Sequence, residues 1–563
     1  VHGLPIIEHA EFGRNVPDEA MPDEDKMNLG KIYHMGKEEA AGLLLNRQAM
    51  ASHTFITGST GTGKSNAVYH LLDEITKNGQ TTFLVVEPAK GEYKNVFGNC
   101  TDVQVFGTNP RETPLLRMNP FAFPENIHIL EHIDRLVEIF NACWPMYAAM
   151  PAVLKDAIER SYQKVGWDLR NSESEKGVFP TFFDLLDILP GVIEESHYSK
   201  DTQSDYVGAL CTRVKSLTNG IYGSVLCAED ALTDEALFDR NVIVDLSRVG
   251  SMETKSLLMG ILVMKLQEYR MCSSGMNSRL RHVTVLEEAH NLLRKTSAEQ
   301  SQEGANLQGK SVEMLANAIA EMRTYGEGFI IADQAPGLLD MSVIRNTNTK
   351  IILRLPDEED RKLVGKSAAL KEAQIDELSK LPLGVAAVYQ NEWPEAVLCK
   401  IEAYPMPENA VYHKPSKMPH EINAEFVFGQ LAAGKELEPL SSSEMEQLKR
   451  WLKRHETMLK SGDSRYLERV FAGGELDVAK TRKAVFDFFG GIGTVVDYCA
   501  AAEKSLTPRK EFLEQLQGQY GLKAAAADWV LNSVISMGMS LNPDAKAVDN
   551  LRTNFERQGG RVL

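Results

Sequence analysis

The sequence predicts an α/β fold, a doubly wound and mainly parallel sheet that carries a helical insertion and is followed by a C-terminal helical region. Three observations support this prediction. Short apolar segments alternate with helical ones between residues 53 and 403, as in parallel βαβ units. A glycine-rich turn joins the first of these strands to a helix. A long stretch with helical spacing, about 120–238, separates the second strand from the third.

The expected strands are short and rich in β-branched and aromatic residues, which favour extended structure. They cover 53–57, 83–87, 242–246, 283–286, 329–332, 350–354 and 396–401. The first helix of the insertion has an apolar face at helical spacing, made by Ile129, Ile133, Leu136, Val137 and Phe140. The strands and this helix define the expected core, 53–403, with its insertion at about 120–238.

The segments on either side of the core read as connecting or separate parts. Residues 1–52 are polar and include the acidic, proline-containing stretch 17–25, so we expect an N-terminal arm or linker, which would also suit the remnant of an upstream domain. Four prolines, at 405, 407, 415 and 419, predict a linker over 404–420. Residues 421–563 should be helical, and Thr507-Pro508 there fits an N-cap followed by proline at the first helical position.

Composition excludes some classes of protein. The net charge of −17 argues against a protein that coats nucleic acid with its whole surface, although a few lysines or arginines suffice for a local basic channel. The longest apolar run near the middle, Leu257–Met264, is far shorter than the roughly 20 residues of a membrane span. Seven scattered cysteines without a CxxC pair indicate reduced thiols. We therefore expect a cytoplasmic protein without a membrane partner.

The glycine-rich turn has the GxxxxGK[ST] form of a phosphate-binding loop, from Gly58 to Ser65. Its backbone N–H groups would surround the β-phosphate at the N-terminus of the following helix, where the helix dipole favours an anion. Lys64 would reach the β- and γ-phosphates, and the Ser65 hydroxyl would bind Mg²⁺. The expected ATP-binding residues are Gly58, Thr60, Gly61, Thr62, Gly63, Lys64, Ser65 and Asn66.

A second strand supplies the acidic groups that ATP hydrolysis requires. The apolar segment 283–286 ends in Glu287 and Glu288. We expect Glu287 to hold Mg²⁺, through a water molecule, and Glu288 to polarise the water that attacks the γ-phosphate. Most such strands end in Asp-Glu, so the longer Glu287 leaves the rate of hydrolysis open. After the next strand, Gln334 is the candidate γ-phosphate sensor.

Taken together, these motifs resemble the HerA/FtsK-like superfamily of P-loop ATPases, and HerA-type proteins most closely. The resemblance covers about residues 28–402. It rests on the segments His53–Ser65, Glu87–Tyr93, Leu286–Leu293 and Arg323–Gly326, followed by Asp333-Gln334-Ala335-Pro336. The P-loop alone is generic, whereas this combination in this order is specific.

The resemblance implies a RecA-like ATPase core that assembles into a homo-hexameric ring around double-stranded DNA. It also implies roles for two more residues. Glu87 falls where HerA-type proteins carry an acidic residue near the nucleotide, and Arg323 falls at the arginine that acts on the γ-phosphate of the neighbouring subunit. HerA proteins usually carry an N-terminal β-barrel, for which the 52 residues before the P-loop are too few.

A candidate DNA contact lies between the acidic strand and the segment with Arg323. The polar stretch Thr296–Gly309 should be a flexible loop, flanked by Arg294, Lys295 and Lys310. In a ring it could grip phosphates without reading bases. A solvated surface loop is an equally good interpretation.

Three functions remain open at this point. The first is an ATP-driven translocase or helicase on double-stranded DNA that works with a separate nuclease or effector, in DNA end processing or antiphage defence. The second is a nucleotide-gated scaffold that activates a partner enzyme. The third is an ATPase of a secretion or conjugation system. No nuclease, Ser/His/Asp or Cys/His constellation stands out in the sequence, so cutting would belong to the partner.

Overall fold

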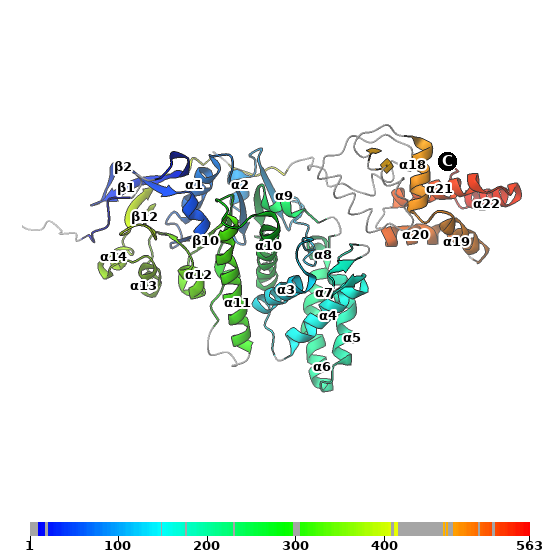
Figure 1. The fold of residues 1–563 in the computed structure, drawn as a ribbon, viewed down its shortest axis with the longest axis horizontal. Helices are drawn as coiled ribbons and strands as arrows, with labels where there is room; N and C mark the ends of the chain where they lie inside the picture. The colour runs from blue at the N-terminus through cyan, green and yellow to red at the C-terminus, as the bar shows by residue number, and fades with distance from the viewer. Residues whose placement is uncertain are drawn as a thin grey trace, which may run out of the picture. The chain divides into compact units, whose positions relative to one another are not determined.

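The computed structural model describes residues 9–562 except 17–20, 148, 175–176, 229–230, 297–303, 407–409, 415–465, 468, 471–476, 505–506 and 521–523. The chain divides into two compact units. The larger one contains residues 1–173 and 179–414, and the smaller one contains 174–178 and 415–563. Figure 1 shows the sheet-containing unit and the helical unit, and each is described by itself below.

The larger unit is built on one eleven-stranded sheet in the order β2-β1-β13-β12-β11-β3-β10-β9-β4-β8-β5. From β11 to β5 all neighbouring strands are parallel, whereas β12, β13, β1 and β2 pair antiparallel. The mainly parallel, doubly wound fold is therefore confirmed. The parallel strands are β3 (Thr54–Thr57), β4 (Thr82–Glu87), β5 (Val103–Gly107), β8 (Asn241–Asp245), β9 (His282–Glu287), β10 (Glu327–Asp333) and β11 (Thr349–Ile352).

All seven expected strands are present within a few residues of the expected bounds. Between residues 53 and 403, two strands of the central sheet were not predicted, β5 and β12 (Val385–Gln390), while β13 (Val397–Ile401) matches the last expected one. The sequence of β5, Val-Gln-Val-Phe-Gly, is short and lies before the long insertion. Its strand character depends on pairing with β8, which follows more than 130 residues later and is invisible to a local pattern.

The expectation of an arm or linker over 1–52 is wrong for residues 26–46. These residues form β1 (Lys26–His34) and β2 (Lys37–Asn46), a hairpin that joins the central sheet when β1 pairs with β13. Met27, Leu29, Leu43 and Leu45 are buried in the main core. In β1 the buried Met27 and Leu29 alternate with polar residues, the half-buried strand pattern, which the overall polarity of the segment obscured, whereas in β2 Leu44 stands between the two buried leucines. Part of the acidic stretch, residues 17–20, lies outside the described residues.

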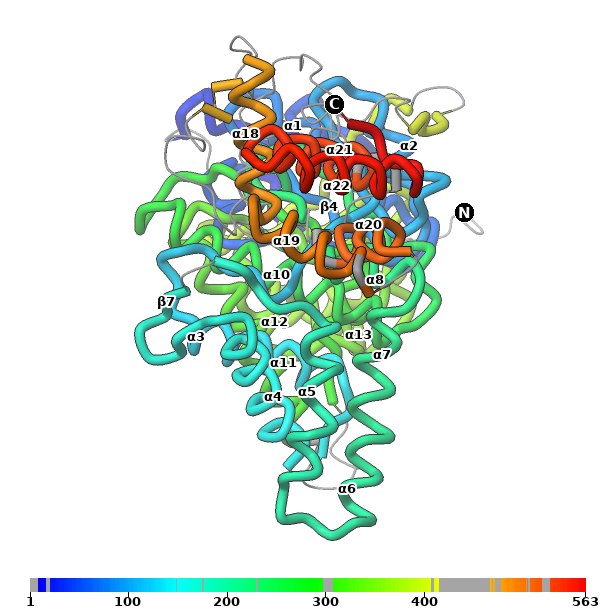
Figure 2. Tube along the Cα trace, turned by 90° about the vertical axis from the view of Figure 1, so that its right-hand side faces the viewer, coloured from blue at the N-terminus to red at the C-terminus, as the bar shows by residue number. Residues whose placement is uncertain are grey.

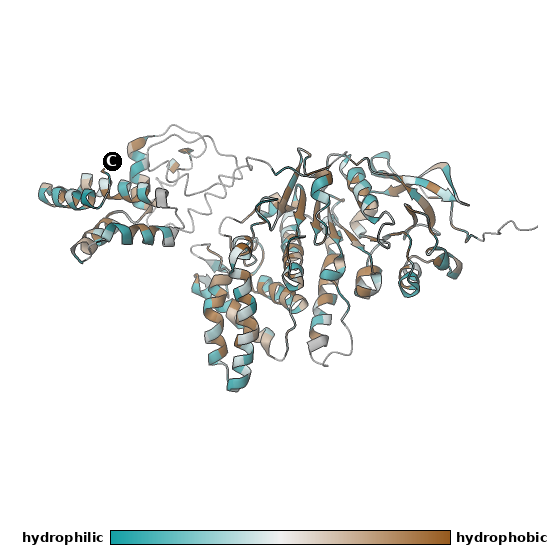
Figure 3. Cartoon of the chain, turned by 180° about the vertical axis from the view of Figure 1, so that it is seen from behind, coloured by the Kyte–Doolittle hydropathy of each residue, from teal (hydrophilic) through white to brown (hydrophobic). Residues whose placement is uncertain are grey.

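Helices cover both faces of the sheet. On one face, α1 (Lys64–Thr76) and α2 (Tyr93–Phe97) contribute Leu72 and Phe97 to the same core as Val85 and Ile330 of the strands. On the other face lie α10 (Met252–Ser273) and α11 (Gly304–Glu321), and Ile331 of β10 lies beside Ile319 of α11. Figure 3 shows the hydrophobic strands enclosed between these layers.

Between β5 and β8 the chain is mostly helical and extends away from the sheet (Figures 1 and 2). Its α-helices are α3 (Ile129–Cys143), α4 (Met150–Lys164), α5 (Phe182–Glu195), α6 (Lys200–Tyr206), α7 (Thr212–Thr218), α8 (Gly220–Leu226) and α9 (Asp234–Phe238). The expected apolar face of α3 is buried, and α3 packs against α10 and α11. The insertion is thus anchored on the same face of the sheet as these two helices.

The described part of the smaller unit is helical, with α18 (Val478–Phe488), α19 (Gly491–Lys504), α20 (Pro508–Tyr520), α21 (Ala524–Leu541) and α22 (Ala545–Arg557) around a core of its own. The expected helix start at Pro508 is confirmed. Of the expected linker 404–420, residues 404–406 and 410–414 have no regular structure, and 415–420 lie outside the described residues, as do 421–465.

Among the described helices, none is by itself both long enough and apolar enough to cross a membrane. One bent pair, Val478–Phe488 with Gly491–Ala502, meets those criteria only when the two helices are taken together.

Candidate nucleotide site

The phosphate-binding loop connects β3 to α1, in the middle of the sheet. Gly61 and Gly63 have φ values of 76° and 108°, in the region that favours glycine. Gly58 is required by crowding, since a Cβ there would lie 2.7 Å from both Leu353 Cβ and Thr62 Oγ1. The loop is held at its start by Ser59, whose N–H donates to the Arg354 carbonyl at 3.0 Å. The sequence motif therefore has the local geometry that the phosphate-binding interpretation requires.

Lys64 lies between the two acidic residues at the end of β9. Its Nζ is 3.3 Å from Glu287 Oε2 and 3.1 Å from Glu288 Oε1, and all three side chains are largely buried. Burial lowers the pKa of Lys64, but the two carboxylates outweigh this effect and raise it. The ammonium group is thus held charged at the point where it would meet phosphate oxygens.

Gln334 joins the acidic pair to the phosphate-binding loop. Its Nε2 donates to Glu288 Oε1 at 2.6 Å, and its Oε1 accepts from the Thr60 hydroxyl at 2.7 Å. Gln334 reaches both groups because β10 lies between β3 and β9 in the sheet, and the carboxyl ends of these three parallel strands lie side by side. The structure therefore brings together three motifs that were predicted separately: the phosphate-binding loop with Lys64, the acidic pair Glu287 and Glu288, and Gln334.

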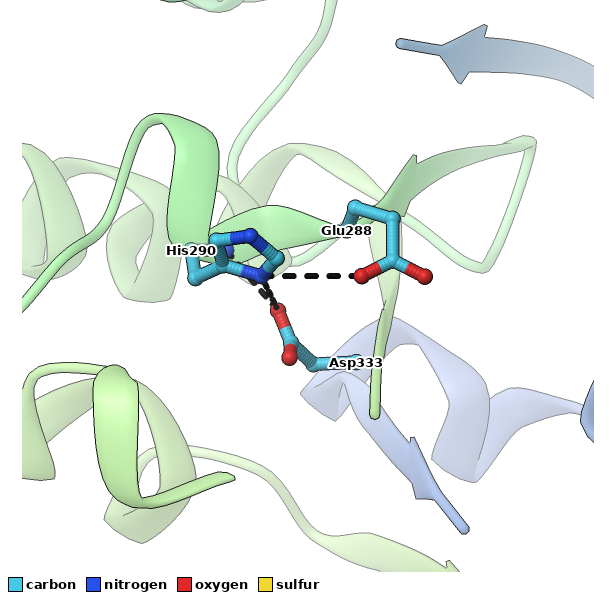
Figure 4. A group of neighbouring side chains, drawn as sticks. All are labelled: Glu288, His290 and Asp333. Atoms are coloured by element: carbon cyan, nitrogen blue, oxygen red, sulfur yellow. Dashed lines mark hydrogen bonds and ion pairs between the residues drawn. The ribbon is translucent and has the colours of Figure 1, made fainter. Parts of the chain in front are cut away.

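Asp333 ties the Glu288 turn to the Gln334 loop, and sequence reasoning missed it (Figure 4). Its buried carboxylate accepts from Ala335 N–H through Oδ1, and from both the backbone N–H and the Nδ1 of His290 through Oδ2, at 2.8 to 2.9 Å. This hydrogen bond raises the pKa of His290. Glu288 itself has φ 45° and ψ 51°, a strained conformation for a residue with a side chain. The position of Asp333 directly before Gln334 was the available signal.

Glu87 lies at the end of β4, beside β9, but it does not line the phosphate-binding pocket. Its carboxylate accepts the backbone N–H groups of Glu92 at 2.7 Å and Tyr93 at 3.1 Å. Burial raises the pKa of Glu87 to about 7, although these hydrogen bonds oppose the change. The Tyr93 hydroxyl in turn donates to Glu287 Oε1 at 2.5 Å. Glu87 therefore holds the Glu92–Tyr93 turn, and its expected catalytic role stays a prediction.

A cavity of about 270 Å³ lies over the phosphate-binding loop and includes Gly61, Lys64 and Ser65. Ser65 is half-buried in the first turn of α1. The Asn66 side chain is engaged elsewhere, because its Nδ2 donates to the Glu402 carbonyl and its Oδ1 accepts from Tyr404 N–H. Asn66 therefore has only its backbone N–H to offer a phosphate. Ser65 and Glu287 together provide the hydroxyl and carboxylate oxygens that Mg²⁺ prefers.

Arg323 lies away from this cavity. It is an exposed residue of the short 3₁₀ turn Met322–Tyr325, which follows α11 and precedes the first residue of β10. The apolar residues of α11, Val312, Leu315, Ala316 and Ile319, are buried. Arg323 therefore lies at the amino-terminal end of the parallel strands, whereas the phosphate-binding loop of its own chain lies at their carboxyl-terminal end.

The expected flexible loop Thr296–Gly309 is shorter than predicted, because α11 begins at Gly304. Lys310 is consequently an exposed residue of a helix, not a loop flank. Arg294 and Lys295 are exposed at the other end, where the backbone pairs with Leu338 and Leu339. Residues 297–303 lie outside the described part of the chain. A DNA-binding role for these three basic residues stays a prediction.

The fold and the site define the class of this protein, a P-loop ATPase. Residues 27–265 match the family model of the helicase HerA central domain. The chain is 25% identical over 393 residues to the DNA double-strand break repair helicase HerA of Sulfolobus acidocaldarius, a match that covers 67% of this chain and 69% of that protein.

A "probable helicase" of Methanocaldococcus jannaschii is 23% identical over 436 residues, covering 71% of this chain and 76% of that protein. Among solved structures, VirB4 of Thermoanaerobacter pseudethanolicus superposes with a TM-score of 0.51 at 18% identity, over 68% of this chain and 98% of that one. At this identity the likeness to VirB4 concerns the fold.

Proposed function

We propose that this protein is an ATP-hydrolysing, HerA-like ring motor that translocates on or unwinds double-stranded DNA. The core supplies a phosphate-binding loop, an acidic pair and a sensor residue in mutual contact. The similarity to helicases, one of them a DNA double-strand break repair helicase, supports DNA as the substrate of the motor. A separate nuclease or effector enzyme would perform any cutting, in DNA end processing or antiphage defence.

In the proposed reaction, Ser65 and Glu287 would hold Mg²⁺, and the bound ion would supply positive charge against the phosphates of ATP. Lys64 leaves its two carboxylate partners and binds phosphate oxygens. Glu288 accepts a proton from the attacking water. Gln334 senses whether the γ-phosphate is present, and its contacts with Thr60 and Glu288 link it to the phosphate-binding loop and to the base. The Lys64 contacts with both glutamates keep the three catalytic side chains together before ATP binds.

The position of Arg323 is the observation that supports a ring. This exposed arginine lies at the end of the strands opposite the phosphate-binding loop, so it has no access to the nucleotide of its own chain. A neighbouring subunit in a head-to-tail ring would bring its nucleotide to this arginine. We therefore propose a homo-hexamer in which each Arg323 completes the ATPase site of the next subunit.

The test is ATP hydrolysis by the purified chain at low salt, with and without linear duplex DNA, with the assembly state measured on the same sample. Low salt is chosen because phosphate contacts weaken steeply as salt increases. We expect a hexamer whose turnover rises several-fold or more with DNA and is abolished by Lys64→Ala. Lys77→Ala, which changes an exposed lysine at the far end of α1, is the matched control and should behave like the wild type.

Other outcomes would favour the alternatives. Turnover that ignores DNA but responds to an effector protein would replace the motor with a nucleotide-gated scaffold. Turnover that responds to membranes or to secretion components would favour a secretion or conjugation ATPase. In each case, loss of turnover in Lys64→Ala still shows whether the phosphate-binding loop is responsible for the ATP hydrolysis.

A further inference from the structure

One exposed apolar side chain borders the otherwise polar nucleotide cavity. Leu383 is 61% exposed and lines the same cavity as Gly61, Gly63 and Lys64. Leu383 belongs to the turn between α14 (Glu372–Glu377) and β12, so it reaches the cavity from a part of the chain more than 300 residues away from the phosphate-binding loop. An exposed leucine is unremarkable on a surface, but its place beside a ligand cavity calls for an explanation.

The backbone around Leu383 is fixed against the phosphate-binding loop. The Leu383 carbonyl accepts from Lys400 Nζ at 2.6 Å. The next residue, Gly384, donates its N–H to the Thr62 carbonyl at 3.0 Å, and its own carbonyl accepts from Ile401 N–H at 2.9 Å. Gly384 has φ 71°, so the turn also depends on glycine. Leu383 is therefore held in place while its side chain remains uncovered.

We propose that Leu383 is the apolar surface on which the nucleoside of the bound nucleotide rests. The glycines, Lys64 and Ser65 account for the phosphates, which leaves the base as the part of ATP with an apolar face. Because the cavity is continuous from the phosphate-binding loop to Leu383, one ligand can occupy both parts. A leucine side chain offers contact area without a hydrogen-bonding pattern, so this contact accepts adenine and guanine alike.

This inference rests on the P-loop ATPase assignment and is independent of DNA translocation. The test compares two probes in the wild type and in Leu383→Ala, with binding measured by titration calorimetry in the presence of Mg²⁺. ADP contains the nucleoside, whereas inorganic tripolyphosphate does not. We expect Leu383→Ala to weaken ADP binding by about fivefold, from the loss of buried apolar contact, and to leave tripolyphosphate binding unchanged. GDP should weaken by a similar factor.

Two further variants sharpen the result. Leu383→Met keeps the apolar volume and should bind ADP like the wild type. Leu541→Ala removes a leucine of comparable exposure in the smaller unit and should change nothing. The proposal is overturned if Leu383→Ala leaves ADP binding intact, or if it weakens ADP and tripolyphosphate equally, which would mean that Leu383 only shapes the phosphate-binding loop. If the wild type bound neither probe, the nucleotide site itself would be refuted, whereas missing DNA stimulation would refute only the motor.

Discussion

Arg323 and Gln334 lie at opposite ends of one strand. Arg323 precedes Glu327, the first residue of β10, and Gln334 follows Asp333, the last. A strand of seven residues covers about 20 Å. Gln334 contacts Glu288 and Thr60 at the nucleotide site, so Arg323 is separated from that site by the length of β10. The arginine and the sensor of one chain must therefore serve different nucleotides if both act in hydrolysis.

This separation predicts that two inactive variants restore each other. Arg323→Ala and Lys64→Ala should each lower turnover by at least about 10³-fold, since a trans-acting arginine neutralises charge in the transition state. After equal amounts are mixed and reassembled, roughly a quarter of the subunit interfaces would pair an intact Arg323 with an intact Lys64, as expected for head-to-tail contacts in a ring. ATP hydrolysis by the mixture measures this.

Arg345→Ala, a change at the end of α12 (Met341–Arg345), is the control for the loss of an arginine and should hydrolyse ATP normally. Mixed rings that stay inactive would show that Arg323 does not complete a neighbouring site.

Glu288→Gln should lower the rate of ATP hydrolysis without weakening nucleotide binding. The amide keeps an oxygen that accepts from Lys64 and Gln334, but it cannot take a proton from water. We expect turnover to fall by about 10²–10⁴-fold, the usual contribution of a general base, while ADP affinity stays within about twofold of the wild type, because ADP carries no γ-phosphate. Steady-state hydrolysis and nucleotide titration measure the two effects. A variant that still hydrolyses ATP at the wild-type rate would remove Glu288 from the base role.

Asp333→Asn should reduce turnover without changing the affinity for ATP. The amide oxygen replaces one of the two acceptor oxygens that hold His290 and Ala335, so the turn that carries Glu288 loses part of its support. We expect kcat to fall about tenfold, since misplacing a catalytic group has large effects, with KM nearly constant.

Asp340→Asn changes a nearby aspartate that caps α12, and asparagine caps equally well. This control should leave both constants unchanged. An equal loss in the two variants would point to a general effect on folding.

The buried Glu87 predicts a dependence of stability on pH. Burial raises its pKa from 4.5 to about 7, so the folded chain binds this proton more tightly than the unfolded chain. The resulting stabilisation is complete below pH 4.5 and is lost as pH rises through 7. Between pH 5.5 and 8, the melting temperature of the wild type should therefore fall further than that of Glu87→Gln, which stays uncharged. Thermal unfolding in matched buffers measures the difference, and parallel curves would contradict the assigned shift.

Much of the core was predictable because its signals are local. The phosphate-binding loop is contiguous from Gly58 to Ser65, and its glycines and lysine encode the turn directly. The strands that directly precede Glu288 and Gln334 are short apolar runs followed by polar residues, which a local pattern detects. The N-terminal hairpin was misread because its apolar residues are diluted among charged ones, and only its pairing with β13 identifies it as part of the sheet.

The sequence by itself determined the chemistry available to this protein, a phosphate-binding loop, two carboxylates and an amide at the ends of successive strands. The tertiary structure decided which of these groups meet. Strand order places β10 between β3 and β9, and this order depends on pairing between segments hundreds of residues apart. The same non-local packing uses Glu87 to hold a turn, commits the Asn66 side chain to residues 402–404, and brings Leu383 to the edge of the nucleotide cavity.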